Sequence, residues 1–254
     1  MFYNSIIKDH LDWLNDRGRN QFYKTTIQNH CKDKICVDVG AGTGILTDYA
    51  LDGGAKKVYC IEIRKARANY LKEKYKGKNV EVIEEDFLNT NINDADIFFL
   101  EQIGCQFSND FSIKKFMSHI KLNAETIPNR YVLKAYIYDG IINEPPTVLI
   151  DSDILPKQFY NNAQKLQSIR PVEIIDVYEI NRNNANDNVS FKIDLTHYKD
   201  CTVLLDDDVY FNDTRCEYEN TYRTLTNKPY ILHIKDSKQI YEVSWNKEWL
   251  IKKI

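Results

Sequence analysis

Short apolar runs alternate with charge-rich amphipathic segments along the first half of the chain, up to about residue 120. Four of these runs have the length of strands, and the first is apolar enough to be buried on both faces. Alternation of this kind predicts strand–helix–strand units that build a parallel sheet. The predicted strands are KICVDVG (34–40), KVYCIEI (57–63), VEVIEED (80–86) and ADIFFLEQ (95–102).

Helices are predicted between these strands and before the first of them. GILTDYALDGG and RKARANYLKEKY have helical patterns, and the former ends at Gly53 or Gly54, as is typical of a helix C-cap. Upstream, apolar residues recur at helix-like intervals that are interrupted near Gly18. We therefore expect two helices before the sheet. The apolar positions are Ile6, Leu11, Leu14, Phe22 and Ile27.

The pattern changes after IPNRYVLKAYIYD (127–139), where short β-rich runs are separated by Asn- and Asp-rich turns such as NRNNANDN (181–188). This arrangement is typical of antiparallel structure. We expect an α/β fold with a Rossmann-like domain over residues 1–126, and a smaller antiparallel β-barrel-like domain over residues 127–254. The later runs are VEIIDVYEI, VSFKIDLTHY, CTVLLDDDVYF, YILHIKD and IYEVSWN.

Composition narrows the class of protein. The chain has 254 residues, of which 43% are hydrophobic and 28% charged, enough for a sizeable core. No apolar run approaches the roughly 20 residues that a membrane span needs, and the start does not read as a signal peptide, so we expect a cytoplasmic protein. Six cysteines without a C-x-x-C pair indicate neither zinc nor disulfides. A net charge of -3 argues against an overall basic surface for nucleic acid.

One stretch holds much of the glycine of a glycine-poor chain. The first strand ends in Asp38 and runs through Gly40, Gly42 and Gly44 into a helix. Such a turn lets main-chain amides and a helix N-terminus approach a ligand closely, because glycine adopts positive φ and has no Cβ. Glu62 ends the next strand, about 20 residues on, where an acidic group accepts both hydroxyls of a ribose. The conjunction predicts a nucleoside ligand.

The third strand ends in Asp86 and Phe87, placed to accept the exocyclic amine of an adenine and to lie beside its ring. Together with the glycine turn and Glu62, these residues resemble the cofactor site of the class I S-adenosylmethionine-dependent methyltransferases. The resemblance implies S-adenosylmethionine as cofactor and S-adenosylhomocysteine as product. Rossmann dehydrogenases are the main competitor, but the turn is G-x-G-x-G rather than G-x-G-x-x-G.

The fourth strand leads into FFLEQIGCQFSND (98–110), which resembles the SEWMGY loop of the protein arginine methyltransferases. Glu101 and Gly104 fall on the first glutamate and the glycine of that motif, and Asp110 takes the place of the second glutamate. WLNDRGRNQFYKTTI is similar to the family's MLKDxxRxxxYRxAI helix, and IPNRYVLKAYIYD to its PxRAxLxxxxIED segment. The resemblance covers residues 3 to about 140, and it implies that Arg19 meets the cofactor's carboxylate.

Paired carboxylates suit a guanidino acceptor. Guanidinium is protonated near neutral pH, yet two carboxylates can bind it bidentately and orient one nitrogen toward a methyl donor. Glu101 and Asp110 are therefore the predicted catalytic residues. Because two close carboxylates repel one another, we expect a cation between them, either Arg19 or the substrate. Asp110 is equally placed to cap a helix over FSIKKFMSHI.

The chain also departs from that family. Gln102-Ile103 replace Trp-Met after the first glutamate, and TLTNKP (224–229), at the place of the Thr-His-Trp loop, has neither His nor Trp. His197, in LTHY, is expected in a strand. The segment available for a dimerisation arm, within PPTVLIDSDILPKQFYNNAQKLQSIR, is short, so any dimer is expected through another interface.

Alternative functions follow from these departures. A small guanidino or amino metabolite is one alternative to a protein acceptor, and a catalytically silent binding protein is another. No N/D-P-P-F/Y motif follows the fourth strand, which disfavours the amino-methylating DNA enzymes. RKARANYLKEKYKGK (64–78) is basic, but its alternating charges are typical of a solvated helix, so nucleic acid is not the expected partner.

Overall fold

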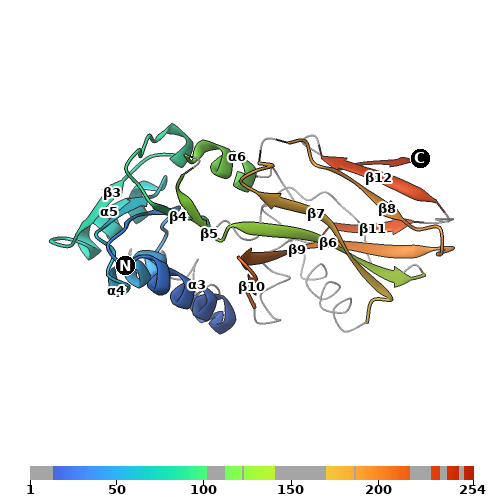
Figure 1. Ribbon diagram of the computed structural model, residues 1–254, viewed down its shortest axis with the longest axis horizontal. Coiled ribbons are helices and arrows are strands. Elements are labelled where there is room, and N and C mark those ends of the chain that lie inside the picture. Colours follow the sequence, from blue (N-terminus) through green and yellow to red (C-terminus); the bar gives the residue numbers. More distant parts are fainter. Residues whose placement is uncertain are drawn as a thin grey trace.

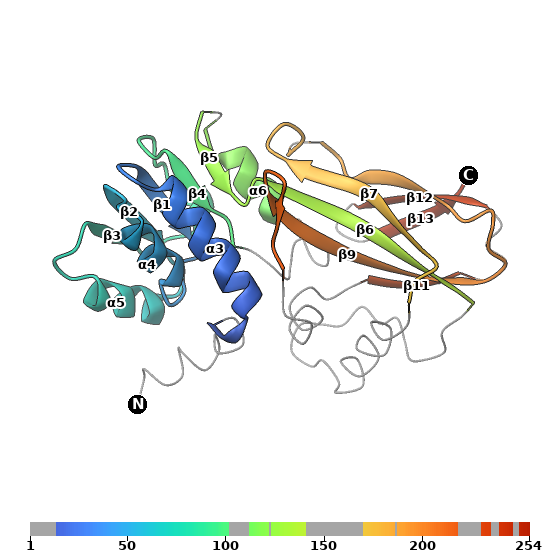
Figure 2. The same cartoon turned by 60° about the horizontal axis from the view of Figure 1, so that its bottom comes forward.

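The computed structural model describes residues 14–101, 112–121, 123–140, 170–185, 187–217, 230–234, 239–245 and 249–254. Figures 1 and 2 show two parts arranged along the longest axis of the molecule, an α/β half followed by an antiparallel β half. This is the fold class that the pattern of apolar residues predicts.

The α/β half is built on a five-stranded sheet in the order β3-β2-β1-β4-β5, in which all neighbouring strands are parallel. The four predicted strands are confirmed, and β5 was not predicted. Because β1 lies between β2 and β4, the chain reverses its direction of winding there, and in open α/β sheets ligands bind outside the carboxyl ends of the strands at such a point. The strands are β1 (Ile35–Val39), β2 (Lys57–Ile61), β3 (Val80–Ile83), β4 (Ile97–Phe99) and β5 (Glu125–Ile127).

Helices connect these strands as predicted, and α4 is followed by Gly53 as its C-cap. Helix α3 packs against α4, and α6 packs near the short 3-10 helix η1 (Figure 2). Within the described ranges, no helix is long and apolar enough to cross a membrane. The helices are α3 (Arg17–His30), α4 (Ile45–Asp52), α5 (Lys65–Lys74), η1 (Phe87–Asn89) and α6 (Ser112–His119).

The predicted interruption near Gly18 is found two residues earlier in the chain. The break before α3 falls at Asp16, whose side chain caps the helix by accepting a hydrogen bond from the Arg19 amide at 2.9 Å. Gly18 lies inside α3, where a Cβ atom would lie 1.8 Å from the carbonyl oxygen of Glu217. Glycine at this position therefore allows the second half of the chain to approach the helix backbone.

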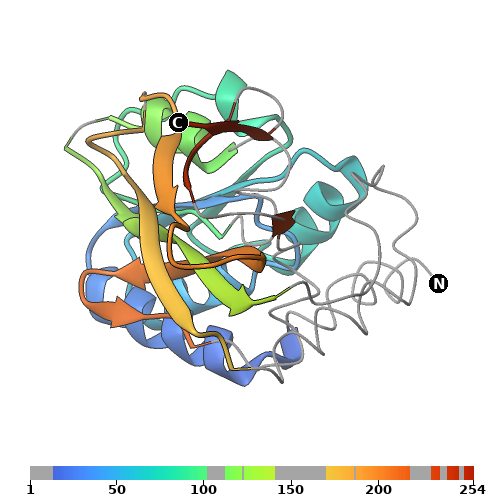
Figure 3. The same ribbon diagram turned by 90° about the vertical axis from the view of Figure 1, so that its right-hand side faces the viewer.

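Among the described residues of the second half, the strands form two antiparallel sheets, and Figure 3 shows this half turned toward the viewer. One has the order β10-β9-β6-β7 with β11 also paired to β9, and the other has the order β13-β12-β8. Both sheets contribute to the same hydrophobic core, through residues such as Leu133 and Val243. The strands are β6 (Arg130–Asp139), β7 (Glu173–Asn181), β8 (Ser190–Asp194), β9 (Cys201–Phe211), β10 (Thr214–Arg215), β11 (Tyr230–Ile234), β12 (Ile240–Trp245) and β13 (Trp249–Lys253).

The expectation that His197 lies in a strand is wrong. Strand β8 ends at Asp194, whose carboxylate accepts hydrogen bonds from the amide and the hydroxyl of Thr196 at 2.9 and 2.6 Å. This side-chain contact offers the backbone a turn in place of a ladder. His197 is an exposed residue of that turn.

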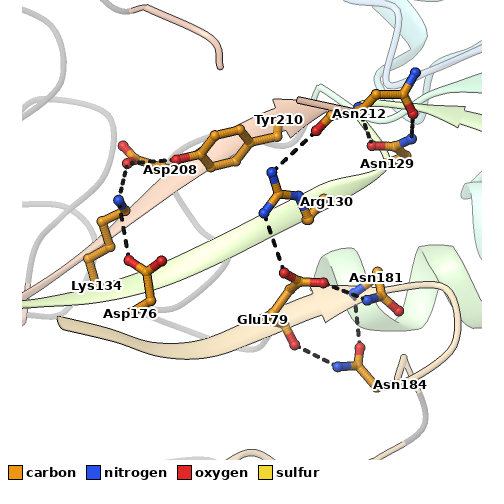
Figure 4. Close-up of polar contacts among 10 residues, drawn as sticks. All are labelled: Asn129, Arg130, Lys134, Asp176, Glu179, Asn181, Asn184, Asp208, Tyr210 and Asn212. Atoms are coloured by element: carbon orange, nitrogen blue, oxygen red, sulfur yellow. Dashed lines mark hydrogen bonds and ion pairs between the residues drawn. The ribbon is translucent and has the colours of Figure 1, made fainter. Parts of the chain in front are cut away.

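A polar network joins three strands of the larger sheet (Figure 4). The buried carboxylate of Asp208 on β9 lies 3.2 Å from Lys134 Nζ, which also contacts Asp176 on β7 at 3.2 Å. Arg130 lies over the ring of Tyr210, 4.2 Å from its centroid. Each charge of this network has a partner of opposite sign, so we interpret the network as one that holds the strands in register.

The two halves also bond to each other through α6. The guanidinium of Arg182, in the turn after β7, donates to the carbonyl oxygen of Ile120 at 2.8 Å and to those of Lys121 and Ala124. The ammonium of Lys114 donates to the carbonyl oxygen of Asp187. The contacts of Arg182 and Lys114 therefore connect the segment after β7 with α6 and with the residues that follow it.

Candidate functional site

The glycine turn after β1 has the backbone that its sequence predicts. Gly40, Gly42 and Gly44 have φ values of 71°, 56° and 78°, which residues with a side chain rarely adopt. Gly44 is the N-cap of α4, and a Cβ atom there would lie 2.3 Å from the hydroxyl of Tyr75. The turn therefore brings bare main chain to the carboxyl edge of the sheet at the start of a helix, a combination suited to a polar or anionic ligand.

Side chains at the end of α5 hold this turn in place. The buried Tyr75 donates its hydroxyl proton to the carbonyl oxygen of Gly44 at 2.6 Å, and Lys74 donates to that of Thr43 at 2.9 Å. Lys74 also pairs with Asp48 of α4 at 2.6 Å. The turn is thus rigid without any contribution from a ligand, which lowers the entropy cost of binding one.

Glu62 lies directly after β2, and its carboxylate is 3% exposed. One oxygen accepts a hydrogen bond from the Gly42 amide at 3.0 Å, and the other accepts from the Arg64 amide at 2.8 Å. Each carboxylate oxygen has a second lone pair. Glu62 is therefore oriented at the same edge as the glycine turn and retains lone pairs, and its contact with the two hydroxyls of a ribose stays a prediction.

Asp38, near the end of β1, is buried with 2% of its surface exposed. It accepts hydrogen bonds from the Thr47 hydroxyl at 2.7 Å and the Thr47 amide at 3.1 Å. Burial raises the pKa of the Asp38 carboxyl from an ordinary 3.8 to about 6; the bonds from Thr47 oppose this rise, and the nearby carboxylates of Glu101 and Glu62 add to it. Three acidic groups thus gather at this edge, a field that favours a cationic ligand.

The raised pKa predicts that Asp38→Asn stabilises the unliganded protein above pH 6. A folded-state pKa above the unfolded one means that stability is present below the unfolded pKa and is lost as the pH rises through the folded pKa. The shift corresponds to about 3 kcal/mol. Asparagine keeps the bonds from Thr47 and carries no charge. Urea unfolding should show a gain of about 1 to 3 kcal/mol at pH 8 and a smaller gain at pH 4.

The exposed Asp33→Asn is the control, and it should change stability by less than about 0.5 kcal/mol at both pH values. A variant Asp38→Asn that is less stable than the parent chain at pH 8 would contradict the assignment of a costly buried charge to Asp38.

Arg19 and Glu101 are 82 positions apart in sequence, and the fold brings them into contact. Arg19 Nε donates to Glu101 Oε1 at 2.8 Å, and Arg19 Nη1 donates to Asn20 Oδ1 at 2.6 Å. The arginine side chain is 3% exposed and the glutamate side chain 20% exposed. Arg19 is therefore a cation beside Glu101, and Glu101 lies at the carboxyl end of β4 with part of its surface accessible. The expected cation between Glu101 and Asp110, either Arg19 or the substrate, stays a prediction.

Asp86 lies at the same edge after β3. Its Oδ1 caps η1 by accepting from the Leu88 amide at 3.0 Å. The ring of Phe87 is 5% exposed and packs edge-on against Phe116 and His119 of α6, with centroids 5.5 and 5.1 Å apart. This packing accounts for an aromatic residue at position 87, and the contacts of Asp86 and Phe87 with an adenine stay predictions.

Other predicted elements lie outside the described residues. They are Asp110, Gln102-Ile103, Gly104, the TLTNKP segment and the segment that would contain a dimerisation arm. The second member of the acidic pair thus keeps both readings, as a catalytic residue and as a helix cap.

Sequence reasoning missed the residues that hold the site from behind. Thr47, Tyr75 and Tyr131 contact Asp38, Gly44 and Leu100 respectively. Thr47 could have been suspected, since a hydroxyl in the first turn of the helix after a glycine turn faces the strand that precedes it. No local pattern marks Tyr75 or Tyr131, because their partners lie 31 residues away in each case.

Comparisons with known proteins identify the same half of the chain. The family model described as ribosomal RNA adenine dimethylase matches residues 19–123. A ribosomal RNA small subunit methyltransferase A of Mesomycoplasma hyopneumoniae is 28% identical over 69% of this chain and 66% of that protein. A protein arginine N-methyltransferase 1 of Caenorhabditis elegans is 43% identical over 21% of this chain and 16% of that protein. The chain therefore spans less than two thirds of the length of these relatives.

Solved structures match nearly the whole chain. A crystal structure of PRMT6 superposes with a TM-score of 0.65 at 16% identity, over 99% of both chains. The PRMT6–SAH structure gives a TM-score of 0.64 over 98% of this chain. The Arabidopsis thaliana protein arginine methyltransferase 10 gives 0.59 at 14% identity, over 100% of this chain and 99% of that one. Both halves of the chain, in this order, therefore have the architecture of those proteins.

The residues fit the cofactor of this fold, since the glycine turn admits main-chain contact and the buried acidic edge suits a cation that carries ribose hydroxyls. The PRMT6–SAH structure is one of this fold whose name includes such a compound. The chain therefore has the two-domain architecture of the protein arginine methyltransferases, and its first half is similar in sequence to ribosomal RNA methyltransferases and to protein arginine methyltransferases.

Proposed function

We propose that the chain transfers a methyl group from S-adenosylmethionine to a guanidino nitrogen. The observation that carries this proposal is the carboxylate of Glu101, which lies at the carboxyl end of β4 beside the acidic edge and is oriented by the buried Arg19. A carboxylate accepts N–H bonds from guanidinium in bidentate geometry. An adenine amine carries no positive charge for it to bind.

In this proposal, residues at the carboxyl edge of the parallel sheet and Arg19 of α3 hold the cofactor. Gly40, Gly42 and Gly44 lie against the bound cofactor, Glu62 and Asp86 accept from its ribose and its adenine, and Asp38 balances its positive charge. Arg19 donates to its carboxylate while keeping Glu101 in place.

The acceptor is oriented by the second set of residues. The cofactor would supply a methyl group bound to a sulfonium sulfur; the carbon–sulfur bond breaks as the carbon–nitrogen bond forms, and the neutral thioether S-adenosylhomocysteine leaves. Glu101, with Asp110 as the predicted second carboxylate, holds one guanidino nitrogen in line with that carbon, and orientation of this kind contributes on the order of 7 to 11 kcal/mol in the best cases. The guanidinium loses one proton in the course of the transfer, and the acidic residues are the nearest bases.

A second function has independent support. The match to the ribosomal RNA adenine dimethylase model and the similarity to a bacterial ribosomal RNA methyltransferase favour an adenine of RNA as acceptor. Against this, the residues after β4 are Leu-Glu-Gln-Ile-Gly, without the N/D-P-P-F/Y motif of amino-methylating enzymes.

A labelling experiment distinguishes the acceptors. The protein is incubated with methyl-labelled S-adenosylmethionine and, separately, with cell protein, total RNA and a metabolite extract. We expect label in protein, recovered as methylarginine after acid hydrolysis. Label only in RNA, recovered as methyladenosine, would replace this function with the second one, and label only in small molecules would keep the guanidino chemistry but remove the protein acceptor.

Calorimetry with S-adenosylmethionine, combined with the labelling experiment, tests the alternative that the chain is a catalytically silent binding protein. Binding without transfer to any of the three pools would identify the chain as a binding protein.

A cytoplasmic location and a dimer through an interface other than an arm are part of the proposal, and light scattering of the purified protein tests the dimer.

A further inference from the structure

The hydroxyl of Tyr131 makes a buried contact between the two halves of the molecule. Tyr131 lies on β6, at the start of the second half, and its side chain is 0% exposed. The hydroxyl donates to the carbonyl oxygen of Leu100 at 2.7 Å. Leu100 lies just after β4, in the cofactor-binding half, and it is itself fully buried.

This contact is made to the peptide group that joins Leu100 to Glu101. The carbonyl of Leu100 and the amide of Glu101 belong to one planar unit. On the other side of Leu100, its own amide donates to the carbonyl oxygen of Ile127 at 2.9 Å. Leu100 is thus held at both ends, and the Tyr131 bond sets the orientation of the plane that carries Glu101.

The far end of Glu101 is held separately. Its carboxylate accepts from Arg19 of α3. The main chain of Glu101 is therefore positioned by the second half of the chain and its carboxylate by the first half. A change at either end would move the carboxylate by a fraction of the side-chain length.

The surroundings of Tyr131 exclude water. Tyr23 of α3 is 0% exposed and Cys216, which follows β10, is 1% exposed. The pKa of the Tyr23 phenol is raised by burial and by the proximity of Glu101, Tyr131 and Cys216, so these groups occupy one buried region behind the acidic residue. Because no water can replace the Tyr131 hydroxyl there, its loss would leave the Leu100 carbonyl without a partner.

We propose that Tyr131 is a positioning residue for the transfer reaction. Through its hydrogen bond to the Leu100 carbonyl, the position of the β half determines the position of Glu101. The proposal rests on the proposed function in assuming that Glu101 binds the acceptor. The PxRAxL pattern has alanine where this chain has Tyr131, so the hydroxyl is a feature of this chain. It supplies a contact that an alanine cannot make.

Tyr131→Phe removes this hydroxyl and keeps the ring. With the acceptor pool that takes label, we expect kcat to fall about 10- to 100-fold, because a displacement of about 1 Å in a group that orients a substrate can lower the rate about 100-fold. The KM for S-adenosylmethionine and its calorimetric Kd should change by less than about 2-fold, since no predicted cofactor contact is altered. Tyr198→Phe, which removes an exposed hydroxyl bonded to Glu173 at 2.9 Å, is the matched control and should leave kcat unchanged.

A double-mutant cycle separates positioning from general loosening. If Tyr131 acts through Glu101, Tyr131→Phe should reduce kcat no further in a Glu101→Gln background, whereas a merely structural effect would multiply with it. Replacement of Tyr131 by 4-aminophenylalanine keeps a donor at the same place and should restore kcat to within about 3-fold of the parent chain. This variant also serves if Tyr131→Phe does not fold.

A readout without turnover makes the proposal independent of the acceptor. The protein is labelled with ¹³C at the side-chain carboxyl carbon of glutamate and studied by NMR, and the Glu101 signal is assigned by its absence from Glu101→Gln. This signal should shift in Tyr131→Phe and stay in place in Tyr198→Phe. If no pool is methylated but this signal shifts, the proposed function fails while the positioning contact stands. An unmoved signal, or multiplicative losses of kcat in the cycle, would overturn the role of Tyr131.

Discussion

Replacing Glu101 with glutamine should lower kcat by about 10³-fold while S-adenosylmethionine still binds within about 3-fold of its original affinity. The amide oxygen still accepts from Arg19 Nε, which Glu101 Oε1 contacts at 2.8 Å, so the local structure is preserved. What is lost is the negative charge that binds the guanidinium and orients its nitrogen. Labelled-methyl transfer at saturating acceptor measures kcat, and calorimetry measures the affinity.

Glu81→Gln is the control for this change. Glu81 is an exposed glutamate of β3 paired with Lys57 at 2.7 Å, and its loss should leave kcat within about 2-fold. If Glu101→Gln kept full turnover, the carboxylate would not be the acceptor-binding group, and the guanidino chemistry would lose its main support. If it lost both turnover and cofactor binding, Glu101 would instead belong to the cofactor site.

Arg19→Met should destabilise the protein by about 3 kcal/mol and weaken S-adenosylmethionine binding at least about 10-fold. Methionine fills the place of the arginine stem, so the change removes mainly the charge. The Glu101 carboxylate then lies beside the other acidic groups without its cation. We place the expected cost at the low end for a buried pair because Glu101 retains 20% exposure. Urea unfolding and calorimetry measure the two effects.

A second substitution tests the reason for this loss. In Arg19→Met/Glu101→Gln no unpaired carboxylate is left, so at least about 1 kcal/mol of the lost stability should return. Cofactor affinity should stay low, because the predicted partner of the cofactor's carboxylate is still missing. Lys72→Met, which breaks the surface pair with Glu84, should cost less than about 0.5 kcal/mol. Full recovery of cofactor binding in the double variant would show that Arg19 acts only by holding Glu101.

Local signals explain why much of the site could be found before the fold was known. The glycines after β1 indicate a main chain that comes close to a ligand, and Glu62 and Asp86 follow strand-like runs. In a parallel sheet the ends of consecutive strands meet at one edge, so the prediction of strands was enough to bring these residues together. The antiparallel half was predictable for a similar reason, since its turns are rich in Asn and Asp.

The differences from the predicted elements come from individual contacts that the pattern of apolar residues does not encode. Gly18 looked like a helix break but lies inside α3, because the backbone at Glu217 passes so close that a Cβ atom would collide with it. His197 looked like a strand residue, but the Asp194 side chain ends the strand before it. The ring of Phe87 packs on α6, a contact that the sequence pattern did not reveal, and its place beside an adenine stays a prediction.

The sequence by itself determined the order of strands and helices, the glycine turn and the acidic groups at the strand ends, because these depend on residue periodicity and backbone freedom within short windows. Only the tertiary structure decided that Arg19 pairs with Glu101, that burial and neighbouring carboxylates raise the pKa of Asp38, and that Tyr131 of the β half holds the Leu100 carbonyl. The physical reason is that charge pairing, desolvation and buried hydrogen bonds depend on which groups share a volume. Residues that are 31 to 82 positions apart share one only after the chain has folded.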